Sequence, residues 1–268
     1  MEHGENGKIR ATVHYDGTGF HGSQRQPAAR TVQGEVERCL RRLFEEATRV
    51  DAAGRTDTGV HAAGQEIAFT PPPGWDPPEL RRALNAVLPG DIWIESLTEA
   101  EPDFHPRFSA TGRRYEYYVG TAADFMAPSW LNRVWQFGSP LSTDILRSAA
   151  KPTLGRHSFA RLSKTGAVEK STICCIEKAE WTDMGGGNVR LTVVADRFLH
   201  RMVRYLVATM VDIALEKRPL TDISALLAAR KARPPEPAPA VGLYLTGVRY
   251  AEGWNRAPGV PGLGAVRA

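Results

Sequence analysis

Residues 9–15 read Ile9-Arg-Ala-Thr-Val-His-Tyr15, and this stretch sets the first element of the fold. Its apolar side chains occupy every second position, which is typical of a strand with one buried face. Thr31 follows as a candidate helix N-cap, and apolar residues then recur at helical spacing, at positions 32, 36, 39, 40 and 43. The sequence therefore predicts a strand over 9–15 and a helix that begins after Thr31.

The same alternation of elements continues along the chain. Apolar periodicity and turn residues predict further strands at 50–53, 65–69, 92–97, 113–119, 172–181, 189–195 and 243–250. They predict further helices at 80–87, 143–150, 198–215 and 222–229. Two successive runs of strand, helix, strand, strand, helix and strand indicate an α+β fold made of two ferredoxin-like halves.

We expect the antiparallel sheets of the two halves to merge into one mixed sheet, with helices on one side and a cleft between the halves that holds the active site. The N-terminal half would span 1–110 and the C-terminal half 111–252. Residues 253–268 are rich in Gly, Pro and Ala, and we expect them to form a tail.

The charge of the chain is unevenly distributed. The net charge is +4, but residues 1–110 hold 12 basic and 17 acidic side chains, whereas residues 111–268 hold 22 and 13. Arginine supplies 27 of the 34 cations, and its planar guanidinium suits phosphates and stacked bases. Because a GC-rich genome also favours arginine, composition leaves a nucleic-acid partner and compositional bias equally open.

Several classes of protein are excluded by composition. Three cysteines in 268 residues cannot form a disulfide scaffold, and their spacing matches no zinc or redox motif. No run of 18 apolar residues is present, and the N-terminus lacks the apolar core of a signal peptide. We therefore expect a soluble, cytoplasmic protein with no membrane partner and no metal site.

The segment most informative about chemistry is Ala53-Gly-Arg-Thr-Asp-Thr-Gly-Val-His-Ala62. Its two inner glycines permit a tight turn, which would display Asp57 rather than bury it. A carboxylate presented in this way is a candidate catalytic group. An ordinary turn in which Asp57 bonds its own backbone would give the same pattern.

Other stretches accompany this segment in a fixed order. They are Tyr15-Asp-Gly-Thr-Gly-Phe-His-Gly-Ser-Gln-Arg-Gln26 with Thr31-Val-Gln-Gly-Glu35, Phe104-His-Pro-Arg-Phe-Ser-Ala-Thr-Gly-Arg-Arg-Tyr-Glu-Tyr117, Phe198-Leu-His-Arg-Met-Val-Arg204 and Gly242-Leu-Tyr-Leu245. Together with the segment 53–62 they resemble, in order, the motifs of the TruA family of tRNA pseudouridine synthases. The resemblance covers about residues 8–250.

The resemblance implies an isomerase that converts uridine to pseudouridine at positions 38 to 40 of the tRNA anticodon arm. It implies a homodimer, with Asp57 as the catalytic residue. Uracil is detached from C1′ of its ribose, turned and reattached through C5, so the reaction needs no cofactor. Asp57 could attack C1′, add to the pyrimidine ring or remove a sugar proton, and the sequence leaves these routes open.

Arg204 and Tyr115 are the other catalytic residues that the resemblance implies. Arg204 would form an ion pair with Asp57, because a carboxylate in a closed pocket needs a cation to remain charged. Helical projection places Arg204 at the rim of an apolar arc, a position equally typical of an arginine that only reaches to solvent. Tyr115 would stack on the flipped base, although aromatic residues are also common in strand cores.

The resemblance assigns Arg55 to extrusion of the target nucleotide and places an apolar residue against the base, with Leu245 favoured over Leu243. Candidates for phosphate contacts are Arg25, Arg107, Arg113 and Arg114. Each of these arginines could instead be an ordinary surface charge.

Two positions depart from the family pattern. Ser23 stands where the family usually has Trp, and Ser158 where it usually has Asp. Ser23 puts a packing or RNA contact in question, and Ser158 bears on the choice of substrate. Two alternatives to the main interpretation remain: a synthase of the same family that acts on another RNA, and a non-catalytic RNA-binding module, since ferredoxin-like domains with an exposed aromatic strand also bind RNA.

Overall fold

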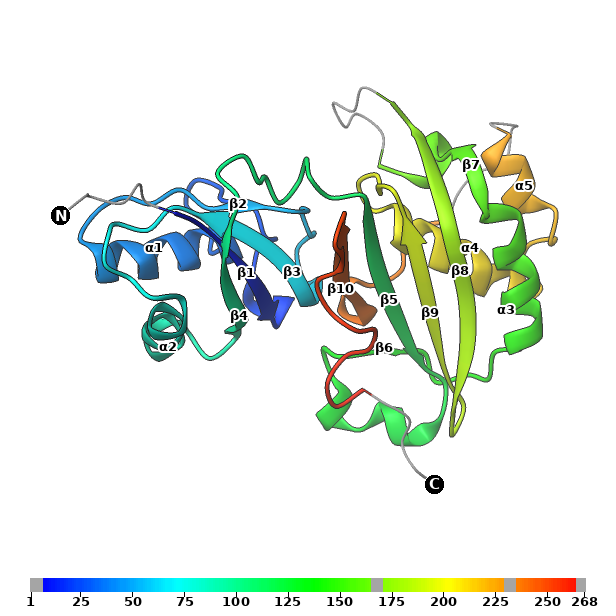
Figure 1. The fold of residues 1–268 in the computed structure, drawn as a ribbon. Helices are drawn as coiled ribbons and strands as arrows, with labels where there is room; N and C mark the ends of the chain where they lie inside the picture. The colour runs from blue at the N-terminus through cyan, green and yellow to red at the C-terminus, as the bar shows by residue number, and fades with distance from the viewer. Residues whose placement is uncertain (1–6, 165–170, 229–234, 264–268) are drawn as a thin grey trace. The chain divides into compact units, whose positions relative to one another are not determined.

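The computed structural model describes residues 7–164, 171–228 and 235–263 (Figure 1). Within these ranges eleven strands belong to one mixed sheet. The chain divides into two compact units that do not follow each other as consecutive blocks. Unit 1 comprises residues 1–111 and 245–258, and unit 2 comprises residues 112–244 and 259–268.

Unit 1 follows the ferredoxin-like order of elements. Its elements from residues 1–111 are β1 (Lys8–Tyr15), α1 (Val32–Phe44), β2 (Asp51–Ala52), β3 (His61–Phe69), α2 (Pro77–Val87) and β4 (Ile92–Ala100). β1 lies between β4 and β3 and pairs antiparallel with both, and β2 pairs with β3. A short 3-10 turn, η1 (Gly17–Gly19), follows β1 directly.

The two helices of unit 1 begin at side-chain caps. Thr31 accepts a hydrogen bond from the Gly34 amide at the start of α1, as its sequence position predicts. Asp76 caps α2 in the same way, by accepting from the Glu79 amide. α1 packs against α2, and α2 packs against β4, which buries the apolar stripes of both helices.

A C-terminal segment completes unit 1. β10 (Leu243–Tyr250) lies next to β3, and β11 (Gly253–Trp254) pairs with β10. Gly64 in β3 allows this approach, since a Cβ at that position would lie 2.6 Å from the Thr246 carbonyl oxygen. β10 therefore belongs to the core of unit 1 from Leu245 onward, although it lies more than 130 residues from β4 in sequence.

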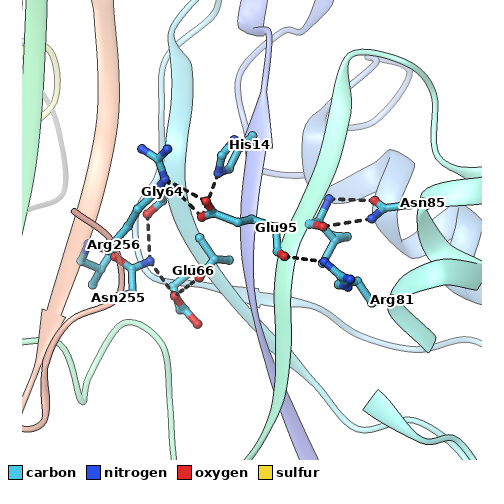
Figure 2. Close-up of polar contacts among 11 residues, drawn as sticks. His14, Gly64, Glu66, Arg81, Asn85, Glu95, Asn255 and Arg256 are labelled. Carbon is cyan, nitrogen blue, oxygen red and sulfur yellow. Dashed lines mark hydrogen bonds and ion pairs between the residues drawn. The ribbon is translucent and has the colours of Figure 1, made fainter. Parts of the chain in front are cut away.

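Asn255 and Arg256 bind this segment to the sheet of unit 1 (Figure 2). The Asn255 amide donates to the Glu66 carboxylate at 2.7 Å and to the Gly64 carbonyl at 3.2 Å. The Arg256 guanidinium contacts Glu95 of β4 at 3.2 Å. Residues predicted to belong to a tail thus contact β3 and β4.

Unit 2 repeats the order of strands and helices. Its elements are β5 (Gly112–Gly120), β6 (Trp135–Gln136), α3 (Thr143–Ala150), β7 (Gly155–Ser158), β8 (Ile173–Gly185), β9 (Asn188–Ala195), α4 (Met202–Ala214) and α5 (Asp222–Leu227), with short 3-10 turns between several of them. The strand order is β5-β9-β8-β7, and β6 pairs in parallel with β5. α3 packs against β8 and α4.

The predicted α+β fold is confirmed, and the differences are shifted element ends and three short strands, β6, β7 and β11, that were not predicted. The helix predicted from residue 198 begins at Met202, because Arg201 adopts a left-handed conformation with φ 62° that ends any continuous helix before it. β3 begins at His61, four residues before its predicted start. α2 begins at Pro77, because proline is accommodated in a first helical turn. The last residue of the helix predicted at 222–229 lies outside the described residues.

Candidate active site

Asp57 lies on a loop between β2 and β3 whose ends are fixed to the rest of unit 1. At one end, the Gln65 side chain donates to the Gly54 carbonyl at 2.8 Å and accepts from the Gly54 amide at 3.3 Å. At the other end, the Val60 amide donates to the Asp57 carbonyl at 3.1 Å and closes a turn. Asp57 remains partly exposed between these fixed points. The loop therefore displays the carboxylate, as the sequence predicts.

Thr56, the residue before Asp57, is held at three polar atoms. Its amide donates to the Ser23 hydroxyl at 2.8 Å, and its carbonyl accepts from the Ser23 amide at 3.1 Å. Its hydroxyl shares a hydrogen bond of 2.8 Å with the Tyr15 hydroxyl. Thr56 is only 7 % exposed, so the backbone that carries Asp57 is anchored in the protein interior.

The segment after β1 packs closely against the backbone of this loop. A Cβ on Gly17 would overlap the backbone carbonyl of Val60, so only glycine fits there. Gly22 has a φ of 93°, and a Cβ there would lie 2.9 Å from the Thr56 carbonyl oxygen. The Gly17 amide donates to Nδ1 of His61 at 3.1 Å, which joins the segment to the start of β3. His61 thus helps to hold the segment after β1 in place beside the loop.

Tyr15 and Asp16, at the end of β1, have opposite pKa shifts. Burial raises the pKa of Tyr15 to about 12, against the smaller effects of its hydrogen bonds with Thr56, Gln65 and Ser23. The contact with the His61 imidazole holds the pKa of Asp16 well below its usual range. Neutral hydroxyl groups therefore support the loop on one side, and a charged carboxylate caps η1 on the other.

The predicted RNA-binding arginines of unit 1 lie on its surface. Arg55 is exposed, two residues before Asp57 on the loop. The Arg25 guanidinium contacts Glu37 at 3.2 Å with 69 % of its side chain exposed. The Arg107 guanidinium lies 5.9 Å from the centre of the Phe108 ring, which is itself 77 % exposed. All three arginines are exposed, and their contact with phosphates stays a prediction.

Three predicted residues, Arg113, Arg114 and Tyr115, lie on β5, in unit 2. Tyr115 is buried, and its ring meets that of Phe198 edge to face at a centroid distance of 5.0 Å. The Arg113 guanidinium donates to the Asp196 carbonyl at 3.0 Å and is partly buried. Arg114, between them, is also buried. The contact of Tyr115 with Phe198 fixes the plane of the tyrosine ring.

Arg204 lies in the first turn of α4, also in unit 2. Its Nε donates to the Ala238 carbonyl at 2.6 Å, and the Ala238 amide donates back to the Arg204 carbonyl at 3.1 Å. Burial raises the pKa of Tyr117 well above its usual value, and the charge of Arg204 opposes this shift. The guanidinium is therefore held partly buried beside a strand that also carries Tyr115.

The predicted site residues divide between the two units. Unit 1 holds Asp57, Arg55, Arg25 and Arg107, together with Leu245, which is buried in β10. Unit 2 holds Tyr115, Arg113 and Arg204. The pairing of residues from unit 1 with those from unit 2 stays a prediction.

Sequence reasoning missed the residues that brace the loop, which are Ser23, Tyr15 and Gln65. Each of them lies at least 8 positions from Thr56 in sequence, so no local pattern linked them to it. One signal was present: a serine stands where the family pattern has a tryptophan.

The described residues contain no group of three or more His, Cys, Asp or Glu side chains that could hold a metal ion. None of the helices in the described ranges is long and apolar enough to cross a membrane.

Comparisons with known proteins show which family the chain belongs to. A family model described as tRNA pseudouridine synthase matches residues 11–109 and 149–251. A protein of Thermotoga petrophila named tRNA pseudouridine synthase A is 37 % identical over 246 residues, which is 91 % of this chain and 99 % of the relative. One of the same name from Geobacillus kaustophilus is 40 % identical over 249 residues, 91 % of this chain and 95 % of the relative. With matches of this extent across both units, the chain belongs to the tRNA pseudouridine synthase family.

Proposed function

We propose that this protein isomerises uridine to pseudouridine at positions 38–40 in the anticodon stem-loop of tRNA. Membership of the family supports the reaction. The observation that carries the proposal is the partly exposed Asp57 carboxylate on a loop fixed on both sides. Reactions at an anomeric carbon need a carboxylate held close to the sugar, and a braced loop supplies that precision.

The other catalytic roles in the proposal are those that the resemblance to the family implies. Arg204 forms an ion pair with Asp57 and keeps it charged once RNA excludes water from the site. Tyr115 stacks on the flipped uracil and replaces the stacking lost in the RNA. Its edge contact with Phe198 supports this role, because it orients the ring before substrate arrives.

The remaining residues bind and position the RNA. Arg55 occupies the space that the flipped nucleotide leaves, a role supported by its exposure beside Asp57. Leu245 lies against the base, and Arg25, Arg107 and Arg113 contact phosphates. The net positive charge of residues 111–268 adds a field that attracts tRNA.

The proposal includes the setting in which the enzyme works. The protein acts as a homodimer in the cytoplasm, with one tRNA in contact with both subunits. It needs no cofactor, because the reaction transfers no electrons and adds no atoms. Analytical ultracentrifugation of the protein with and without tRNA measures the subunit number directly.

The decisive experiment replaces Asp57. We expect Asp57→Ala to form no pseudouridine on unmodified tRNA while its tRNA affinity stays within about threefold of wild type, because phosphate contacts dominate affinity. Asp103→Ala removes an exposed carboxylate from the same unit and serves as the matched control, with activity unchanged. Pseudouridine mapping of the product tRNA gives the readout. Substantial product from Asp57→Ala would refute the catalytic assignment.

The alternatives are separated by the same assay on other substrates. Mapping of pseudouridines in total RNA treated with wild-type protein distinguishes a tRNA enzyme from a synthase that modifies a different RNA. A non-catalytic binding module would bind tRNA and give no pseudouridine even as wild type. The displayed Asp57 speaks against such a module, because a carboxylate repels the phosphate backbone.

A further inference from the structure

We propose that Ser23 is a positioning residue for the reaction, which sets the place of the Asp57 carboxylate through Thr56. The inference rests on the proposed function of Asp57. It assigns to Ser23 an effect on turnover that a merely structural serine would not have. The contacts that carry it all lie within unit 1.

Ser23 holds Thr56 by a reciprocal pair of hydrogen bonds. The hydroxyl accepts from the Thr56 amide at 2.8 Å, and the Ser23 amide donates to the Thr56 carbonyl at 3.1 Å. Thr56 is bonded directly to Asp57 in the chain, so a shift of its peptide group moves the carboxylate. Removal of the Ser23 hydroxyl would cut one of the bonds nearest to the reacting group.

Burial makes this bond difficult to replace. Ser23 is 6 % exposed and Thr56 is 7 % exposed, so water has little access to the amide. A buried amide without an acceptor is costly, and the backbone moves to satisfy it. The Tyr15 hydroxyl already bonds the Thr56 hydroxyl, so it does not substitute as an acceptor for the amide.

Ser23 is itself held in place by a neighbouring helix. Its carbonyl accepts from the Gln33 amide in the first turn of α1 at 2.9 Å. The Gly22 backbone beside it adopts a φ of 93°, which fixes the direction in which the chain arrives at Ser23. Ser23 therefore links the loop to the first turn of α1, and this link limits its movement with the loop.

The hydrogen bond from the Thr56 amide requires a side chain at position 23 that can accept it, and the serine hydroxyl can do so. The indole of tryptophan, which the family pattern has here, only donates and could not accept from Thr56. This chain thus fixes the loop by a bond that a tryptophan at position 23 could not make.

The test separates turnover from binding and from folding. In Ser23→Ala we expect kcat to fall about 10- to 100-fold with KM changed little, because a misplaced catalytic group slows chemistry while RNA contacts remain. Ser23→Thr keeps the acceptor and should restore kcat to most of the wild-type value. Ser23→Cys keeps the volume with a weak sulfur acceptor, so it should fold as wild type does and show an intermediate kcat.

A matched control removes the same kind of bond elsewhere. Ser142 in unit 2 accepts from the Ile145 amide at the start of α3 at 3.3 Å. Ser142→Ala should lower the melting temperature less than Ser23→Ala does, because its hydrogen bond is exposed, and should leave kcat unchanged. In Ser23→Ala, hydrogen exchange of the Thr56 amide should accelerate by more than about tenfold while exchange in α3 stays as in wild type.

Two results would overturn the proposal. The first is a Ser23→Ala enzyme with kcat within about twofold of wild type. The second is an unchanged exchange rate of the Thr56 amide, which is measured without any turnover. If the wild-type protein itself forms no pseudouridine, the proposed function fails, and the exchange measurement still decides whether Ser23 holds the loop.

Discussion

At the scale of single residues, the loop of the candidate site alternates between residues held by hydrogen bonds and residues exposed to solvent. Gly54 and Thr56 are bonded into unit 1, whereas Arg55 and Asp57 between and beyond them reach the surface. The motif predicted which residues are displayed, since glycines and short polar side chains mark a turn. It could not predict the bracing residues, because their contacts form only when distant segments pack together.

Tyr15 gives this network a dependence on pH. The pKa of Tyr15 is raised by burial from 10.0 to about 12, so the native state holds this proton more tightly than the unfolded chain does. Its contribution to stability is complete below pH 10 and is lost as the pH rises towards 12. The expected loss is roughly 3 kcal/mol for a shift of this size.

Tyr15→Phe tests this contribution by removing the titrating group. We expect the unfolding free energy of the variant to decrease less between pH 9 and pH 11.5 than that of wild type, measured by urea denaturation. Other tyrosines and lysines titrate in both proteins, so only the difference between the two curves reports on Tyr15. Parallel curves would contradict the assignment.

At the scale of elements, the local sequence pattern predicted the ends of some strands and helices correctly. The strand at 243–250 and the helix at 143–150 were predicted with their observed ends. β7 and β11 were not predicted, because they are short and pair with β8 and β10 for reasons of tertiary packing. The start of α4 was misplaced, because a single left-handed residue leaves no mark in apolar periodicity.

The segment after β10 stabilises unit 1 through Asn255, and its removal gives an element-scale prediction. Asn255→Ala would leave the Glu66 carboxylate, which is 1 % exposed, without its shortest hydrogen bond. We expect unfolding to cost about 2–3 kcal/mol less at pH 7. Burial raises the pKa of Glu66, and the Asn255 bond opposes this, so the destabilisation should shrink near pH 4, where Glu66 is protonated.

Asn85→Ala is the control for this prediction (Figure 2). Asn85 also makes two amide hydrogen bonds, both to the backbone of Ile94, but no buried carboxylate depends on it. Its loss should cost about 1 kcal/mol and show no such change with pH. Thermal unfolding at pH 4 and pH 7 measures the destabilisation of both variants. If its pH dependence were the same in both, Glu66 would not be the cause of the pH dependence in Asn255→Ala.

At the scale of the whole molecule, the repeated order of elements predicted the fold class, and the family resemblance predicted the reaction. Periodicity placed strands and helices but did not place Asp57 relative to Arg204, because their separation depends on how long-range contacts form. Membership of each compact unit was also beyond the pattern. Residues 245–258 join unit 1 through β10 and Asn255, which no local signal links to β3.

Two truncations of the chain test this composition of unit 1. A chain that ends at Tyr244 lacks residues 245–258, and we expect β1 and β3 to lose their protection against hydrogen exchange. A chain that ends at Pro258 keeps them and should retain protection in both strands. Mass spectrometry of peptides from 8–15 and 61–69 reports each strand. Equal protection in the two truncated chains would show that unit 1 folds without its C-terminal part.

The discontinuous make-up of unit 1 also affects when the protein becomes functional during its synthesis. Residues 1–111 leave the ribosome first, but the part of β10 that belongs to unit 1 begins at Leu245. At translation rates of about 5–20 residues per second, the exposed edge of β3 waits on the order of ten seconds for its partner. The nascent chain therefore carries an incomplete unit 1 through most of its synthesis, when unpaired strand edges are prone to aggregate.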